Sequence, residues 1–174
     1  TGSQTTLHIT HTQLINAPYN LANGETIRFG VDVSSNSSPA SNKKGGNDLT
    51  YDITPPSVSG VTSTTSEGNF VATNTIDIKV TFTEDITVTG TPTLTLETGA
   101  SDQAVNYTSG STSDDLIFRY TVATGHLNAD LDYLSTTALA LNGGTMTDAA
   151  GNPATLTLPT PGASGSLSDD QTYN

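Results

Sequence analysis

The chain has 174 residues and a formal net charge of −12, from 17 acidic and 5 basic side chains, so it lacks the cations that binding to nucleic acid or to an anionic membrane requires. It contains no cysteine, which excludes disulfides, thiolate zinc sites and cysteine nucleophiles. Hydrophobic residues make up 33% of the chain and aromatic residues 6%, a composition that favours the thin cores of small β domains.

The first 54 residues predict an incomplete β module. Apolar and polar residues alternate in three segments, which is the pattern of half-buried β-strands. Three strands leave one apolar face of a sheet that another element must cover. The predicted strands are 5–14, 25–33 and 49–53, with a polar loop over 34–47.

The segment Tyr51 to Pro56 marks a boundary between two modules. Pro55 and Pro56 cannot donate hydrogen bonds to a β ladder, and Pro55 restricts Thr54 to an extended conformation. A strand therefore ends here, and the segment that follows it is conformationally restricted. Asp52 stands just before this exit, where it could serve as a metal ligand.

Beyond the boundary, short segments of alternating pattern follow one another closely. The segment 75–82 places four apolar residues on one face, and Thr83-Glu84-Asp85 interrupts it before a continuation at 86–88. Because no segment sustains a helical period, we predict an all-β sandwich. The other predicted strands are 58–62, 93–96, 104–108, 116–122, 130–134, 138–141 and 154–158, and Leu167 or Tyr173 could belong to a last strand.

The order and spacing of several phrases make residues 56–168 resemble the bacterial immunoglobulin-like tandem repeats of large cell-surface adhesins. Segments 21–33 and 48–56 resemble the last two strands and the exit linker of a preceding repeat. The loop 34–47 departs from the pattern, because Ser35-Asn36-Ser37-Ser38-Pro39 stands where the family usually has Asp-x-x-Gly-Asn. The phrases include Pro56-Ser57-Val58-Ser59-Gly60-Val61, Val80-Thr81-Phe82-Thr83-Glu84, Gly90-Thr91-Pro92-Thr93-Leu94, Ala129-Asp130-Leu131-Asp132-Tyr133, Leu141-Asn142-Gly143-Gly144-Thr145 and Thr147-Asp148-Ala149-Ala150-Gly151-Asn152.

The resemblance implies an immunoglobulin-like antiparallel β-sandwich over residues 55–174, preceded by a partial module over residues 1–54. It also implies a non-catalytic structural or adhesive repeat on a bacterial cell surface or in a secreted protein. Such a repeat acts as a stalk or spacer, its partners are neighbouring repeats or copies of itself, and bound Ca²⁺ is common. No apolar run is long enough to insert into a membrane.

Calcium is the leading candidate ligand, because Ca²⁺ takes six to eight oxygen ligands from carboxylates, carbonyls and amides. In a sandwich the loops gather at two ends, so acids from separate loops can converge. The alternative is that the acids are solvated and that Asp148 and Asn152 only stabilise an Asx turn, in which an Asp or Asn side chain accepts from a backbone N–H just ahead. The candidate ligands are Asp52, Glu67, Glu84, Asp148 and Asn152.

Other functions remain alternatives at this point. Copies could complete the partial first module by strand addition, which would make the chain a subunit of an extracellular filament. The chain could also be an adhesin tip that binds a host or surface ligand, or Lys79 could form an isopeptide cross-link. An enzyme is not expected, because we find no nucleophile elbow, phosphate loop or zinc signature, and the chain has no Trp to stack on a sugar substrate.

Overall fold

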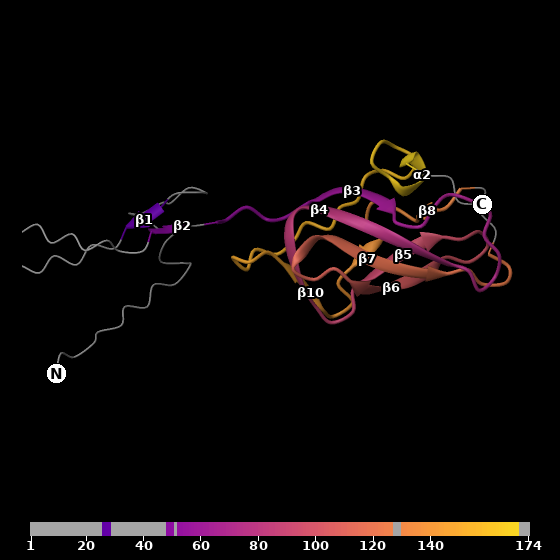
Figure 1. Cartoon of the computed structure of the whole chain (residues 1–174), viewed down its shortest axis with the longest axis horizontal. Helices are drawn as coiled ribbons and strands as arrows, with labels where there is room; N and C mark the ends of the chain where they lie inside the picture. Colours follow the sequence, from indigo (N-terminus) through magenta and orange to yellow (C-terminus); the bar gives the residue numbers. More distant parts are fainter. Residues whose placement is uncertain (1–25, 29–47, 51, 127–129, 171–174) are drawn as a thin grey trace, which may run out of the picture. The chain divides into compact units, whose positions relative to one another are not determined.

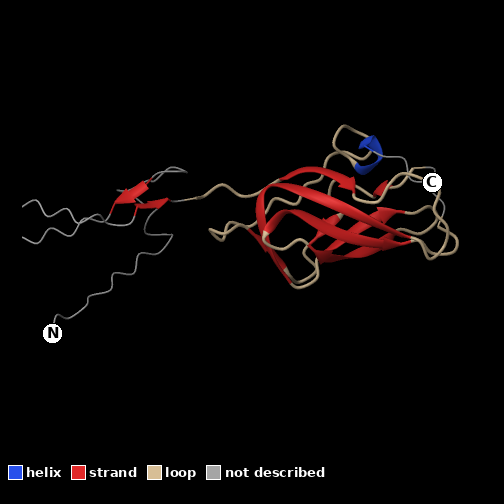
Figure 2. Cartoon of the chain, in the orientation of Figure 1, coloured by secondary structure: helices blue, strands red, loops and turns tan. Residues whose placement is uncertain are grey.

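The computed structural model describes residues 26–28, 48–50, 52–126 and 130–170 of the chain (Figure 1). Contacts between residues divide the chain into two compact units, Thr1–Thr54 and Pro55–Asn174. Strands and loops make up nearly all of the described residues, with one short helix near the end (Figure 2). The predicted all-β class is therefore confirmed, whereas the immunoglobulin-like sandwich stays a prediction.

The first unit contains a two-stranded antiparallel sheet. Strand β1 (Thr26–Arg28) pairs with β2 (Asp48–Thr50), and Ile27 lies opposite Leu49. Strand β1 falls within the predicted segment 25–33, and β2 overlaps the predicted segment 49–53 but begins one residue earlier, at Asp48. The predicted strand 5–14 and the loop 34–47 lie outside the described residues.

The second unit is built on one curled, antiparallel sheet of eight strands, in the order β10-β4-β7-β6-β5-β8 (Figures 1 and 2). Strand β3 also pairs with β4, and β9 also pairs with β5. The sheet curls because β4 pairs β3 and β7 along its first half and β10 along its last residues. The strands are β3 (Val58–Ser63), β4 (Thr75–Thr89), β5 (Thr93–Glu97), β6 (Gln103–Ser109), β7 (Ser113–Thr121), β8 (Asp132–Tyr133), β9 (Leu139–Ala140) and β10 (Thr145–Thr147).

The core lies inside this curl and follows from the period of two along each strand. Alternate residues of β4 from Ile76 to Phe82 are buried, and the residues between them are half-buried. Strands β5 and β7 repeat the pattern with Leu94 and Leu96 and with Leu116, Phe118 and Tyr120. Leu131, Tyr133, Leu139, Met146, Leu158 and Leu167 add buried side chains from the second half of the unit.

Strand β4 differs from the prediction by running unbroken through Thr83-Glu84-Asp85. Its pairing with β7 shifts register between Thr81 and Ile86, so the polar triplet forms an irregularity in the ladder rather than a strand end. The buried Ile86 resumes the core face beyond it. A bulge of this kind bends a strand without ending it, which allows one strand to serve both parts of the curled sheet.

The end of the chain also differs from the prediction. The segment 154–158 makes only one isolated bridge, between Thr155 and Ser57, although its alternating pattern predicts a strand. The prediction also missed β10, which has three residues and follows a turn. Leu167 belongs to the short helix α2 (Leu167–Asp170) instead of a last strand, and Tyr173 lies outside the described residues.

Candidate metal site

Three of the acidic residues predicted as ligands come together in the structure. One carboxylate oxygen from each of Asp52, Glu84 and Asp148 lies within 4.8 Å of the other two. They come from three separate parts of the sequence: the linker, β4 and the turn after β10. Carboxylates this close repel one another, so a bound cation would stabilise the arrangement.

Asp52 is presented by the linker that runs into the second unit. Its Oδ1 accepts a hydrogen bond from the Thr54 backbone N–H at 2.9 Å, which forms an Asx turn. Pro55 and Pro56 follow, and the carbonyl of Pro56 accepts from the Thr155 N–H at 2.7 Å. The turn orients the half-buried Asp52 side chain, and the two prolines fix φ in the backbone that follows.

Glu84 lies at the register shift of β4, where the ladder with β7 is interrupted. Its neighbour Thr83 is tied to the linker, because the Thr83 N–H donates to the Ser57 carbonyl at 2.9 Å and the Ser57 N–H donates to the Thr83 hydroxyl at 3.1 Å. The register shift therefore places the half-buried Glu84 side chain near the start of the second unit.

Asp148 is the buried member of the group, with 4% of its surface exposed. Asn152 satisfies both of its carboxylate oxygens: its backbone N–H donates to Oδ1 at 2.8 Å, and its Nδ2 donates to Oδ2 at 2.7 Å. The Asp148 N–H in turn donates to the Asn152 carbonyl at 3.1 Å. These hydrogen bonds join Asp148 to a residue four positions ahead, whereas the predicted Asx turn would reach two positions ahead. They orient the carboxylate that faces Asp52 and Glu84.

Of the two other predicted ligands, Asn152 contacts the group of three carboxylates and Glu67 does not. Asn152 is buried, and its Nδ2 donates a hydrogen bond to the Asp148 carboxylate. Asn152 therefore orients the candidate ligand Asp148. Glu67 is exposed in the loop between β3 and β4, which leaves the opposite end of β3 from Ser57. The structure therefore does not bring Glu67 to the three carboxylates.

The chemistry of the group suits a hard divalent cation. Three carboxylates supply up to six oxygens and three negative charges, and Ca²⁺ accepts such ligands with flexible geometry. Lone pairs of the Asp148 carboxylate that Asn152 does not use remain available, because a carboxylate has about four acceptor sites. The three residues together form what we call the acidic triad.

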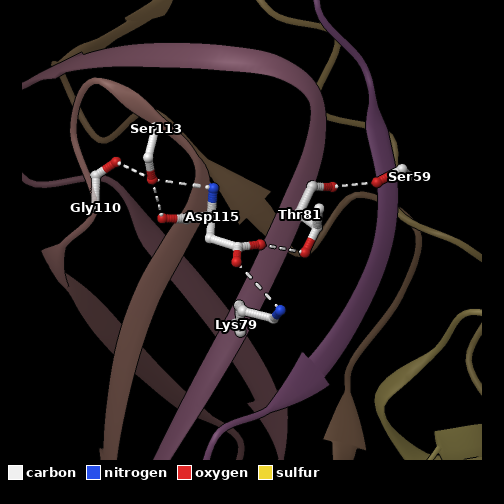
Figure 3. Close-up of polar contacts among 6 residues, drawn as sticks. All are labelled: Ser59, Lys79, Thr81, Gly110, Ser113 and Asp115. Atoms are coloured by element: carbon white, nitrogen blue, oxygen red, sulfur yellow. Dashed lines mark hydrogen bonds and ion pairs between the residues drawn. The ribbon is translucent and has the colours of Figure 1, made fainter.

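A second cluster of polar side chains lies on the outer face of β4 and β7 (Figure 3). The Lys79 ammonium contacts Asp115 Oδ2 at 3.2 Å, and the Thr81 hydroxyl donates to Asp115 Oδ1 at 2.5 Å. The Thr81 hydrogen bond, more than the Lys79 contact, holds the pKa of Asp115 below its ordinary value against a smaller opposing effect of burial. The sequence alone predicts a solvated pair at Asp114-Asp115, because only strand register reveals that Asp115 lies opposite Thr81.

Figure 3 also shows how this cluster connects to the edge strand and to the β6–β7 turn. The Ser59 hydroxyl donates to the Thr81 carbonyl at 3.0 Å and so joins β3 to β4. The Ser113 hydroxyl donates to the carbonyls of Gly110 and Asp115, each at 3.0 Å. The half-exposed setting and the ion pair between Lys79 and Asp115 make this a structural network.

Asp132 is a buried acid that the sequence pattern did not single out. It is 8% exposed, and its Oδ2 accepts from the Gly162 N–H at 3.0 Å and from the Ser168 hydroxyl at 2.7 Å. The neighbouring Tyr133 hydroxyl donates to the Pro159 carbonyl at 2.7 Å, and burial together with the Asp132 charge raises the pKa of Tyr133. These contacts fasten the C-terminal segment to β8.

Comparison of the chain with protein-family models, with curated proteins and with solved structures gives no match. Among the described residues, no helix has the length and apolar character needed to cross a membrane. The function must therefore be argued from the geometry of the chain itself.

Proposed function

We propose that the chain is a non-catalytic spacer segment of an extracellular, surface-attached or secreted protein, built from β modules in series and stiffened by Ca²⁺. The observation that carries the proposal is the acidic triad, which joins the linker residue Asp52 to Glu84 and Asp148. A cation bound by all three would hold the linker in one orientation where the chain enters the second unit. A spacer needs this property, because its reach depends on stiff joints.

A recurrence in the sequence supports the arrangement in series. The pattern Asp-x-Thr-Tyr-Asx, where Asx is Asp or Asn, occurs at residues 48–52, directly before the second unit. It occurs again at residues 170–174, where Asn174 takes the place of Asp52. The linker pattern that precedes the second unit thus returns in its last five residues, as expected in an array of similar modules.

The hydrogen bonding of the second unit bears on strand exchange at that unit, whereas strand addition to the first module stays an alternative. The outer edge of β3 contacts the C-terminal segment through the Val61 N–H and the Gly165 carbonyl, at 2.9 Å. Beside β10, the Ala154 N–H donates to the Met146 carbonyl at 2.9 Å. Within the described residues, these edges are therefore engaged rather than open for a strand from another copy.

The calcium role is tested by thermal unfolding of the whole chain with Ca²⁺ and with chelator. We expect Ca²⁺ to raise the melting temperature, because a ligand that binds only the folded state stabilises it, by about 2.7 kcal/mol at a hundredfold excess over Kd. Glu84→Gln should reduce the shift, whereas Glu67→Gln should leave it unchanged because Glu67 lies outside the triad. A chain whose melting is indifferent to Ca²⁺ would contradict the calcium role.

The stiffening role needs a separate measurement. Small-angle scattering of a tandem protein that joins two copies of the chain should show a longer maximum dimension with Ca²⁺ than with chelator. The same tandem protein carrying Glu84→Gln in both copies is the control, and it should give one profile under both conditions. Binding of Ca²⁺ without any change in the scattering would leave a metal site but remove stiffening as its purpose.

A further inference from the structure

The two ends of the second unit are arranged in a way that bears on how it responds to tension. The chain enters at Ser57, at the start of β3, and α2 lies beside the other end of the same strand (Figure 1). A pull on the chain therefore runs along β3 instead of across it. This matters because hydrogen bonds of an antiparallel ladder lie perpendicular to the strands and are loaded together when the strands slide.

We propose that the second unit is built to bear tension in shear, with β3 held against β4 at the entry and Asp132 holding the C-terminal segment at the exit. This inference rests on the proposed function, since tension along the chain arises only in a module that works in series. It concerns a load-bearing device and is independent of the acidic triad.

The entry is fastened on both edges of β3. On one edge, β3 pairs with β4 from Val58 opposite Phe82 to Ser63 opposite Ile78. Side chains extend this ladder at both ends, because the Ser57 N–H reaches the Thr83 hydroxyl at 3.1 Å and the Ser63 hydroxyl reaches the Asp77 carbonyl at 2.8 Å. Strand β4 is itself held by β7 over the same length, so it is a rigid support.

On its other edge, β3 contacts the segment that leaves the unit. The Val61 N–H donates to the Gly165 carbonyl at 2.9 Å, which joins the entering and leaving segments directly. Gly60 lies at the same place: a Cβ added there would be 3.7 Å from the Gly165 carbonyl oxygen. Pulling the two ends apart therefore slides these two segments past each other as well.

The exit is fastened by a buried carboxylate and a buried apolar side chain. Asp132 accepts from the Gly162 N–H and from the Ser168 hydroxyl, which stand before and after Leu167 in the chain. Leu167 is fully buried, at 0% exposure. The force on Asp170 must break the Ser168 hydrogen bond and withdraw Leu167 before the segment can peel away.

The test pulls the same chain in two directions by single-molecule force spectroscopy. The chain has no cysteine, so attachment points can be introduced freely. Pro55→Cys with Asp170→Cys applies force along β3. Thr64→Cys with Thr121→Cys applies force across the sheet, because both residues are exposed and lie at the same end of the strands on either side of β4.

We expect the axial pull to need a higher rupture force than the lateral pull, because it loads several ladder hydrogen bonds at once and the lateral pull loads them one by one. Ser168→Ala should lower the force of the first axial event and leave the lateral force unchanged. An axial force equal to or below the lateral force overturns the shear arrangement. An axial force that Ser168→Ala does not change overturns the role of Asp132.

Both pulls are made with chelator present, and the two double-cysteine chains are first shown to melt at the same temperature. The result is then independent of Ca²⁺ and of global stability. If the force difference is absent while the calcium shift and the scattering change are found, only the load-bearing device fails. If the force difference is found without any calcium response, the calcium part of the proposed function fails alone.

Discussion

At the scale of single residues, the turn after β10 explains how an acid becomes available as a ligand. Asp148 is buried, and a buried carboxylate is tolerated only when donors satisfy it. Asn152 provides these donors from its backbone and its side chain, four positions further along the chain. The spacing of an Asp and an Asn around a glycine-containing turn is visible in the sequence, so a polar contact at this turn could be predicted, although not its span of four residues.

The same contacts predict the cost of removing Asp148. Asp148→Ala leaves the N–H and the Nδ2 of the buried Asn152 without their acceptor, so we expect a loss of about 1–3 kcal/mol in the free energy of unfolding. Urea denaturation with chelator measures this loss without the contribution of a metal. Asp114→Ala is the matched control on an exposed acid and should change stability by no more than about 0.5 kcal/mol. Equal effects of the two substitutions would contradict the structural role of the turn.

At the scale of elements, β4 and β7 are joined on their outer faces by two charged contacts. Arg119 on β7 donates through Nε and Nη2 to the Asp77 carboxylate at 2.6 and 2.7 Å, and Lys79 on β4 contacts Asp115 on β7. Asp77 lies directly opposite Arg119 in the ladder. The Arg119 hydrogen bonds, with a smaller opposing effect of burial, hold the pKa of Asp77 below its ordinary value of 3.8.

These pKa directions predict how stability changes with pH. A carboxylate whose pKa is lower in the folded state stabilises the fold above the unfolded pKa near 3.8, and the contribution disappears as pH falls through the folded value. Asp77→Asn should therefore lower the free energy of unfolding near neutral pH, by about 0.2–1 kcal/mol because its partner Arg119 is exposed to solvent. The difference from the unmodified chain should shrink as pH falls below that range. A difference that stays constant with pH would show that charge is not its cause.

Strand β4 shows where prediction from hydrophobic periodicity fails. The polar triplet Thr83-Glu84-Asp85 predicts a break, because strand patterns alternate and three polar residues in a row do not. The structure keeps the strand and shifts its pairing instead, since Ile86 can still reach the core on the far side of the bulge. Periodicity cannot distinguish a bulge from a strand end, because only pairing with a neighbour decides it.

At the scale of the whole molecule, the second unit carries its own core. Buried apolar side chains from its strands and from α2 form one continuous cluster within residues 55–174. A unit with its own core can fold without the preceding one. Truncation to this unit is informative because it removes Asp52 and keeps Glu84 and Asp148.

We therefore expect a chain of residues 55–174 to unfold in one cooperative transition, close in temperature to that of the same unit in the whole chain with chelator. Its melting temperature should rise less with Ca²⁺ than that of the whole chain, because one of three carboxylates is missing. Differential scanning calorimetry measures both quantities. A truncated chain that responds fully to Ca²⁺ would place the ion elsewhere, and one that fails to fold would show that the first unit completes the second.

The sequence by itself determined the all-β class and the position of most strands, marked a boundary at Pro55-Pro56 and supplied five candidate ligands, three of which converge. It could do so because each depends on local rules: the period of two in a strand, the missing donor of proline and the side-chain chemistry of Asp and Asn in turns. Only the tertiary structure decided that Glu84 sits on a bulge beside Asp148, that Glu67 lies at the other end and that Asp115 and Asp132 have partners. Those outcomes depend on strand register and on which segments cover which edges, and neither is encoded in the spacing of residues along the chain.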